Sequence, residues 1–322
     1  PAVNTLKKIS ILGEFKSSDE NIQTQNFWSQ CFSPRNDLTE VILSGENVQY
    51  FTTGAFPNMK TLYISGGDAH FPGYKFQIPH PLERVIIDVG TYTSESGSFR
   101  YAAKLTTFKL KAETATLDNR AFYECPALAA VDLTECDSVT YSEGTFGNGT
   151  TSDTENSPMA SNAVIYVKNE DSNPRTGEVA TGLSDTHGIV AITNGGTFAE
   201  GTEFAQGVLA EPTKDGYIFA GWYENSDFSG TAATSVEVGH TYYAKWIELN
   251  TDKITMQYDG SQALPTIDGV TLNNWTSSDE DVVKIIDGQL KAVGVGETTI
   301  TADASLARSG EKLTVHVTVT PR

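Results

Sequence analysis

A repeating pattern of apolar residues constrains the fold of this chain more than any other feature of its sequence. Each copy is an apolar residue followed three and five positions later by two more, and copies begin at positions 6, 38, 59, 82, 105 and 128. The last three steps are each 23 residues long. The pattern predicts stacked units, each giving one short strand whose alternate residues enter a shared core. The triplets are Leu6/Ile9/Ile11, Leu38/Val41/Leu43, Met59/Leu62/Ile64, Leu82/Val85/Ile87, Leu105/Phe108/Leu110 and Leu128/Val131/Leu133.

A phenylalanine precedes four of these copies by six residues, and we expect it to enter the same core from the turn. One unit cannot cover its own apolar face, so neighbouring units have to share it. These residues are Phe32, Phe76, Phe99 and Phe122, while Phe56 and Phe146 lie in shorter or longer turns of the same pattern.

One copy carries enough detail to resemble a known family. Residues 117–133, LDNRAFYECPALAAVDL, resemble the BspA-type leucine-rich repeat, with its Ala-Phe-x-x-Cys-x-x-Leu-x-x-Val-x-Leu signature. The resemblance covers residues 1–168 and implies a curved, surface-exposed recognition solenoid. The three cysteines, Cys31, Cys125 and Cys136, are too few for a disulfide framework. No histidine stands near them in the repeat register, so we expect buried thiols and not nucleophiles.

Two further segments resemble modules of bacterial surface proteins. Residues 212–230, PTKDGYIFAGWYENSDFSG, and the later TYYAKW at 241–246 resemble the Listeria–Bacteroides repeat, a small β domain. Residues 275–302 resemble a bacterial immunoglobulin-like domain of the second group. With 322 residues, several domains are expected. We predict a mainly β chain made of three parts: a solenoid at 1–168, a linker with a small β domain at 169–246, and an immunoglobulin-like β-sandwich at 247–322.

Composition and motifs argue against several functions. The chain has 22 Lys and Arg against 41 Asp and Glu, a net charge of −19 that repels nucleic acid. No apolar run approaches the roughly 18 residues of a membrane span, and no charged-then-apolar leader opens the sequence. His-Glu-x-x-His, Gly-x-Ser-x-Gly, Walker and Rossmann motifs do not occur. We therefore expect no enzyme, cofactor or metal site, although a spatial pair of carboxylates for glycoside hydrolysis stays open.

Three clusters admit both a functional and a structural interpretation, and we favour the structural one for each. Trp222 and Trp246 form either a sugar-stacking platform or the core of a small domain. His70 and His80 lie either in a ligand-contacting loop or in an elongated repeat turn. The acidic run 279–281 is either a calcium loop or a solvated turn.

The outward face of the predicted sheet is the remaining candidate site. If the middle residue of each triplet points inward, the next residue points outward. Ile42, Tyr63 and Ile86 then form an exposed apolar stripe bordered by Lys109, and we predict that these four residues contact a ligand. The alternative is that sheets tolerate such residues on either face.

These features predict a non-enzymatic recognition or adhesion protein, located at a bacterial cell surface or secreted. Its partner would be a host or bacterial surface protein or glycan, with the solenoid as the binding part and the C-terminal domains as a stalk. Two alternatives are a structural envelope spacer without a specific ligand and the accessory region of a larger surface enzyme.

Overall fold

The computed structural model describes residues 8–12, 37–49, 51–76, 79–147, 159–249, 253–306 and 310–322. In these ranges the chain is mainly β, as predicted, with three short helical segments: α2 (Gly45–Val48), η2 (Thr53–Ala55) and η3 (Glu170–Ser172). Leu6, Cys31 and Phe32 lie outside the described residues. The chain divides into two compact units, one of Pro1–Ala210 with Tyr223–Tyr243 and the other of Glu211–Trp222 with Ala244–Arg322.

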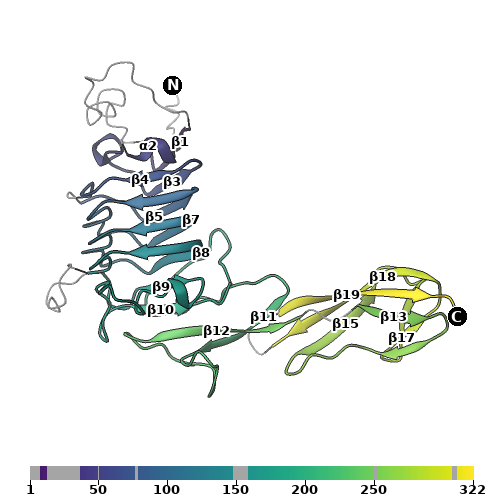
Figure 1. Ribbon diagram of the computed structural model, residues 1–322. Helices are drawn as coiled ribbons and strands as arrows, with labels where there is room; N and C mark the ends of the chain where they lie inside the picture. The colour runs from purple at the N-terminus through teal and green to yellow at the C-terminus, as the bar shows by residue number, and fades with distance from the viewer. Residues whose placement is uncertain are drawn as a thin grey trace. The chain divides into compact units, whose positions relative to one another are not determined.

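The first unit is built on a parallel sheet with one strand for each apolar triplet. The strands pair in the order β1–β2–β3–β5–β7–β8, and Figure 1 shows the later ones stacked along the repeat axis. Backbone N–H and C=O groups of each strand are therefore satisfied by the strand of the next repeat. The bounds are β1 (Lys8–Ile11), β2 (Glu40–Ser44), β3 (Thr61–Ser65), β5 (Arg84–Asp88), β7 (Thr107–Leu117) and β8 (Ala130–Tyr141).

The inward register is the predicted one. The middle residues of successive triplets are aligned across the sheet and fully buried: Val41, Leu62, Val85, Phe108 and Val131. Beside them runs a ladder of stacked rings formed by Phe76, Phe99, Phe122 and Phe146, with centroids 5.9, 6.0 and 5.7 Å apart. The phenylalanines of the described repeats thus enter the shared core, as expected.

Each of the central repeats also contributes a second strand segment, which the triplets did not predict. β4 (Ala69–Phe71) pairs with β6 (Thr91–Ser94), and β6 pairs with the second half of β7, which continues to the second half of β8. The inward residues of this second ladder are small or aromatic, such as Ala69, Tyr92 and Ala115, and are buried. The repeat is therefore wider than a single short strand.

The sheet does not end at the predicted boundary after Lys168. β9 (Val164–Val167) follows β8, β10 (Ile189–Ile192) pairs with β9 in parallel, and β12 (Thr241–Glu248) pairs with β10. The predicted linker between β9 and β10 is held together by hydrogen bonds within itself. The guanidinium of Arg175 donates hydrogen bonds to the carbonyls of Ser184, His187 and Gly188.

The second unit contains two sheets that share one core. One sheet has the order β13 (Ile254–Gln257), β19 (Gly310–Thr320), β18 (Gly296–Ser305) and β15 (Thr271–Ser277). The other has the order β14 (Ser261–Ala263), β17 (Gln289–Ala292) and β16 (Val283–Ile286). Buried side chains of both sheets, among them Ile300, Val315, Val283 and Leu290, form a single cluster. The assignment of this segment as immunoglobulin-like stays a prediction.

Two of the open clusters have structural roles here. In β11 (Tyr217–Tyr223), Phe219 lies edge-on to Trp222 at 5.6 Å and to Trp246 at 5.5 Å. Trp222 is buried and Trp246 half-buried, which agrees with the core interpretation. In the acidic run, the carboxylate of Asp279 accepts the backbone N–H of Asp281, as in a turn.

Candidate ligand-binding face

The four predicted site residues lie in one row on the outward face of the sheet. Ile42 is aligned with Tyr63, Tyr63 with Ile86, and Ile86 with Lys109. All four side chains are half-buried, and the ammonium of Lys8 lies 5.4 Å from the centre of the Tyr63 ring. The structure therefore brings together the residues that the pattern selected, while their contact with a ligand stays a prediction.

The row continues into a part of the sheet that is covered by the chain itself. Beyond Lys109 the aligned residues are Asp132, Tyr166 and Ala191, and all three are buried. Residues 197–210, which we call the strap, lie over them. Tyr166 packs against Phe198 and Phe204, with ring centroids 4.7 and 5.3 Å away.

Hydrogen bonds hold the strap in this position. The Tyr166 hydroxyl donates to the carbonyl of Val208 at 3.2 Å and accepts the N–H of Ala210 at 2.9 Å. The side-chain amide of Gln206 donates to the carbonyls of Pro126 and Leu128. The strap therefore divides the row into an open part, Ile42 to Ile86, and a covered part.

Lys109 lies at this division and is not the free border charge that the sequence predicted. Its ammonium donates to the Phe198 carbonyl at 2.9 Å, pairs with Glu135 at 2.7 Å and lies 3.7 Å from Asp132. Only 20% of its side chain is exposed. The sequence could not reveal this, because the strap contact joins residues 89 positions apart.

A β-bulge places the Glu135 carboxylate on the outward face, together with Asp132. Lys109 is aligned with Asp132, but Lys111 is aligned with Glu135, so β8 has one residue more than β7 at this point. Without the extra residue, the alternation of the strand would turn Glu135 inward. The signal is present in the sequence as a step of 24 instead of 23 residues between Ala112 and Cys136.

Asp132 is a buried carboxylate with one oxygen only partly satisfied. Its Oδ1 accepts the N–H and the hydroxyl of Thr134, at 3.1 and 2.7 Å. Its Oδ2 has no hydrogen-bond partner within the described part of the chain, and the side chain is 1% exposed. Burial raises the pKa of Asp132, and the Thr134 hydrogen bonds and the Lys109 charge act in the opposite direction.

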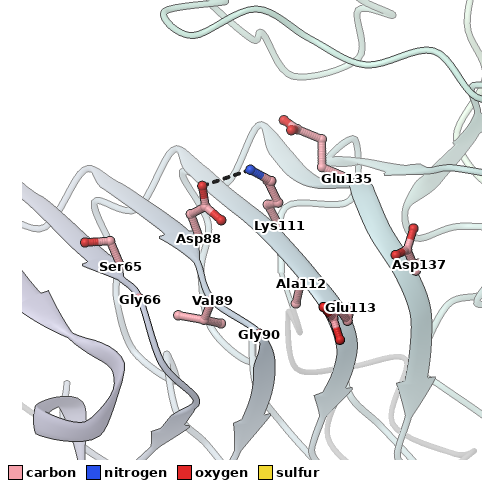
Figure 2. A pocket seen from close by; sticks show the side chains of 10 residues that line it. All are labelled: Ser65, Gly66, Asp88, Val89, Gly90, Lys111, Ala112, Glu113, Glu135 and Asp137. Carbon is pink, nitrogen blue, oxygen red and sulfur yellow. Dashed lines mark hydrogen bonds and ion pairs between the residues drawn. The ribbon is translucent and has the colours of Figure 1, made fainter.

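Two neighbouring hollows share part of their lining, and one of them is lined by this carboxylate and by the strap. The strap hollow, of about 250 Å³, lies between the sheet and the strap and is lined by residues that include Ile86, Lys109, Asp132, Glu135, Glu200 and Phe204. The larger edge hollow, of about 510 Å³, follows the ends of the first strand segments. Asp88, Lys111 and Glu135 line both hollows, and Figure 2 shows Asp88 and Lys111 paired across neighbouring strands.

The charge of the edge hollow is mainly acidic. Its lining carries four carboxylates, Asp88, Glu113, Glu135 and Asp137, and one ammonium, Lys111. The hydrogen bond and the charge of Asp88 raise the pKa of Lys111, which favours the charged ammonium. No sequence motif marks these residues, since only the three-dimensional stacking of repeats brings them together.

The two histidines of the predicted long turn lie in different elements, His70 within β4 and His80 in the segment between β4 and β5. The ring of His80 is buried, accepts the N–H of Leu82 at Nδ1 and donates from Nε2 to the carbonyl of Phe56. Burial lowers the pKa of His80, so its neutral form is favoured. His70 is exposed and contacts Thr93 and Glu95. They do not form one ligand-contacting loop.

The two described cysteines are buried thiols, as predicted. Cys125 donates to the carbonyl of Phe99 and Cys136 to that of Leu110. Burial raises the pKa of each thiol to about 12, which removes the thiolate needed for nucleophilic attack.

Comparison with known families agrees with two of the resemblances. Residues 69–159 match the BspA type leucine-rich repeat region in six copies, and residues 185–245 match the Listeria–Bacteroides repeat domain. A comparison with curated proteins gave no match. Together, the two matched modules indicate a bacterial surface protein.

The described residues contain neither a membrane-spanning helix nor a metal-binding group of side chains. Among them, no helix has the length and the apolar character required to cross a bilayer. No group of three or more His, Cys, Asp or Glu side chains in these ranges is arranged to hold a metal ion.

Proposed function

We propose that this protein is a non-enzymatic recognition module of a bacterial surface, either cell-attached or secreted, and that it binds its partner on the outward face of the repeat sheet. In this proposal the first unit is a leucine-rich-repeat solenoid and residues 247–322 form an immunoglobulin-like sandwich that acts as a stalk. The matched repeat families support the surface location.

The observation that carries the proposal is the open part of the outward row. Ile42, Tyr63 and Ile86 are aligned on neighbouring strands, about 4.8 Å apart in parallel sheets, and they keep exposed surface. Tyrosine suits a contact surface because its ring is large, its hydroxyl can form a hydrogen bond, and few rotamers are lost on binding. Ile86, the last residue of the open part, lines the strap hollow, so a partner on the row also reaches the polar groups there.

Binding to arrays of host proteins, bacterial surface proteins and glycans tests the proposal. For a partner found in this way, we expect Tyr63→Ala to weaken binding by about 1–2 kcal/mol, as for an interface anchor, while the thermal unfolding temperature changes little. Tyr258→Ala is the control, because Tyr258 is an exposed tyrosine that belongs to the second unit.

Two outcomes would contradict the proposal. Equal effects of the two tyrosine substitutions would place the contact elsewhere. If no partner binds in any array, the chain is better described as an envelope spacer.

A further inference from the structure

The strap hollow contains a hydrogen-bond acceptor that the rest of the chain leaves open. Asp132 is almost completely buried, and its Oδ2 has no hydrogen-bond partner among the described residues. A buried carboxylate oxygen without a donor is costly, and native structures retain few of them. Asp132 also lines the hollow, but its Oδ2 has almost no accessible surface, so a ligand in the hollow supplies the missing donor only when the neighbouring side chains shift.

The surrounding charges decide which kind of donor fits. An incoming ammonium at Oδ2 would lie close to the Lys109 ammonium, which is 3.7 Å from the same oxygen and 2.7 Å from Glu135. Two like charges at this separation in a partly buried site repel each other strongly. An anion would meet the carboxylates of Asp88, Asp132, Glu135 and Glu200 in the same hollow. A neutral hydroxyl avoids both conflicts.

The walls of the hollow add two requirements. Ile86 and Phe204 give an apolar surface, and Lys109 and Arg84 are donors beside the carboxylate acceptors. A ligand that fits has an apolar face and several hydroxyl groups that both donate and accept. The volume of about 250 Å³ is below the range of about 300–1,000 Å³ typical of drug-sized ligands, so it suits a single ring.

We propose that the strap hollow binds one neutral pyranose ring of a glycan, with a sugar hydroxyl donating to Asp132 Oδ2 and the apolar face of the ring packed against Phe204. The edge hollow shares Asp88, Lys111 and Glu135 with it and provides space for a neighbouring ring. This inference rests on the proposed function, since it uses the same face of the sheet, and it narrows the partner to a carbohydrate.

Ligand-observed NMR with the full chain tests the inference. The probes are the methyl pyranosides of glucose, galactose, mannose and N-acetylglucosamine, with n-butylammonium and acetate as charged probes. We expect at least one neutral sugar to bind in the millimolar range. Asp132→Asn should weaken that binding about tenfold or more, since it replaces the charged acceptor at Oδ2 by a donor or a neutral oxygen.

A second pair of variants keeps the test decisive if Asp132→Asn does not fold. Glu200 lines the hollow, whereas Glu203, on the same strap and equally exposed, does not. Glu200→Ala should weaken sugar binding several-fold and Glu203→Ala should leave it unchanged. The inference is overturned if none of the sugars binds, if the charged probes bind instead, or if neither Asp132→Asn nor Glu200→Ala changes the affinity.

The outcome can be separated from that of the proposed function. Tyr63 lines neither hollow, so Tyr63→Ala should leave the binding of single sugars unchanged. If no sugar binds, but a protein partner binds and this binding depends on Tyr63, only the carbohydrate inference is overturned. If the sugars bind, but Tyr63→Ala does not weaken the binding of a larger partner, only the role of the open row is overturned.

Discussion

Phe122 and Asp132 are both buried residues of the same repeat, and burial has opposite consequences for them. Phe122 is fully buried and stacked between Phe99 and Phe146, so its burial stabilises the fold. Burial of Asp132 disfavours its charged form, and the chain offers one of its oxygens no hydrogen bond in the described ranges. The first residue is explained by packing alone, whereas the second is better explained by a ligand.

Truncation of Phe122 tests the contribution of the stacked rings. Phe122→Ala should lower the free energy of unfolding of the first unit by about 3–5 kcal/mol, as large aromatic truncations in cores do. Three of the four tryptophans, Trp222, Trp246 and Trp275, belong to the second unit. In urea unfolding, the far-ultraviolet circular dichroism should therefore shift to lower urea, while most of the tryptophan fluorescence change stays at its original midpoint.

Tyr258→Ala serves as the control for this experiment. If Phe122→Ala lowers the free energy of unfolding by less than about 0.5 kcal/mol, the effect is that of a surface substitution. This result would contradict the stacked arrangement.

At the scale of elements, the strap determines how much of the sheet face remains open. Its sequence has glycines at Gly201 and Gly207 and no strand or helix pattern, so it predicts only turns. Phe198 and Phe204 pack on the Tyr166 ring, and the Tyr166 hydroxyl bridges Val208 and Ala210. A single side chain of the sheet thus holds both ends of the segment.

Removal of one hydroxyl should loosen the strap and leave the sheet intact. Tyr166→Phe keeps the ring contacts but leaves the N–H of Ala210 without the Tyr166 acceptor. One hydrogen bond contributes about 1 kcal/mol, so amide hydrogen exchange over residues 205–210 should become about fivefold faster. Tyr242→Phe is the control, since Tyr242 is also buried and its hydroxyl accepts the N–H of Glu237, outside the strap. Unchanged exchange in the strap of Tyr166→Phe would show that the hydroxyl does not hold it.

The period of the sequence predicted the elements that depend on neighbouring repeats. It located the inward residues, such as Leu62 and Val85, because each contacts its equivalents 21 to 23 positions away. It did not predict the second ladder, whose inward positions vary between alanine and tyrosine. It also missed the strap over Lys109, since no period relates residues 109 and 198. The candidate site was therefore only half predicted: its open row was found, and its hollows were not.

At the scale of the whole molecule, the sheet joins parts that the sequence predicted to be separate. The three-part division remains a prediction, but parallel pairing of β8, β9 and β10 crosses the boundary proposed after Lys168. The two hydrophobic clusters follow the two compact units, with one along the repeats and one between the sheets of the second unit. We therefore expect the two units to unfold in two separate steps when denaturant is added.

Limited proteolysis distinguishes a continuous sheet from separate domains. The first cut is expected within Thr176–Ala180, where all five residues are exposed. The two fragments should separate on a denaturing gel but elute together in native gel filtration, because β9 and β10 lie on opposite sides of the cut and pair with each other. Fragments that separate under native conditions would instead support independent domains with a flexible linker. Early cleavage within 82–133 would contradict the repeat assignment.

The central strands of the sheet are separated by a constant number of residues, so this part of the protein consists of units of equal length. Between β3, β5 and β7 each strand residue is aligned with the one 23 positions later, so each inward residue of these strands stacks on an equivalent residue of the neighbouring repeat. Duplication of one 23-residue unit in the gene would therefore lengthen the sheet by one strand, about 4.8 Å, without new contacts in the interior. The length of the outward sheet face can thus change through the number of repeats. The substitutions that determine what the face binds can occur independently of this change.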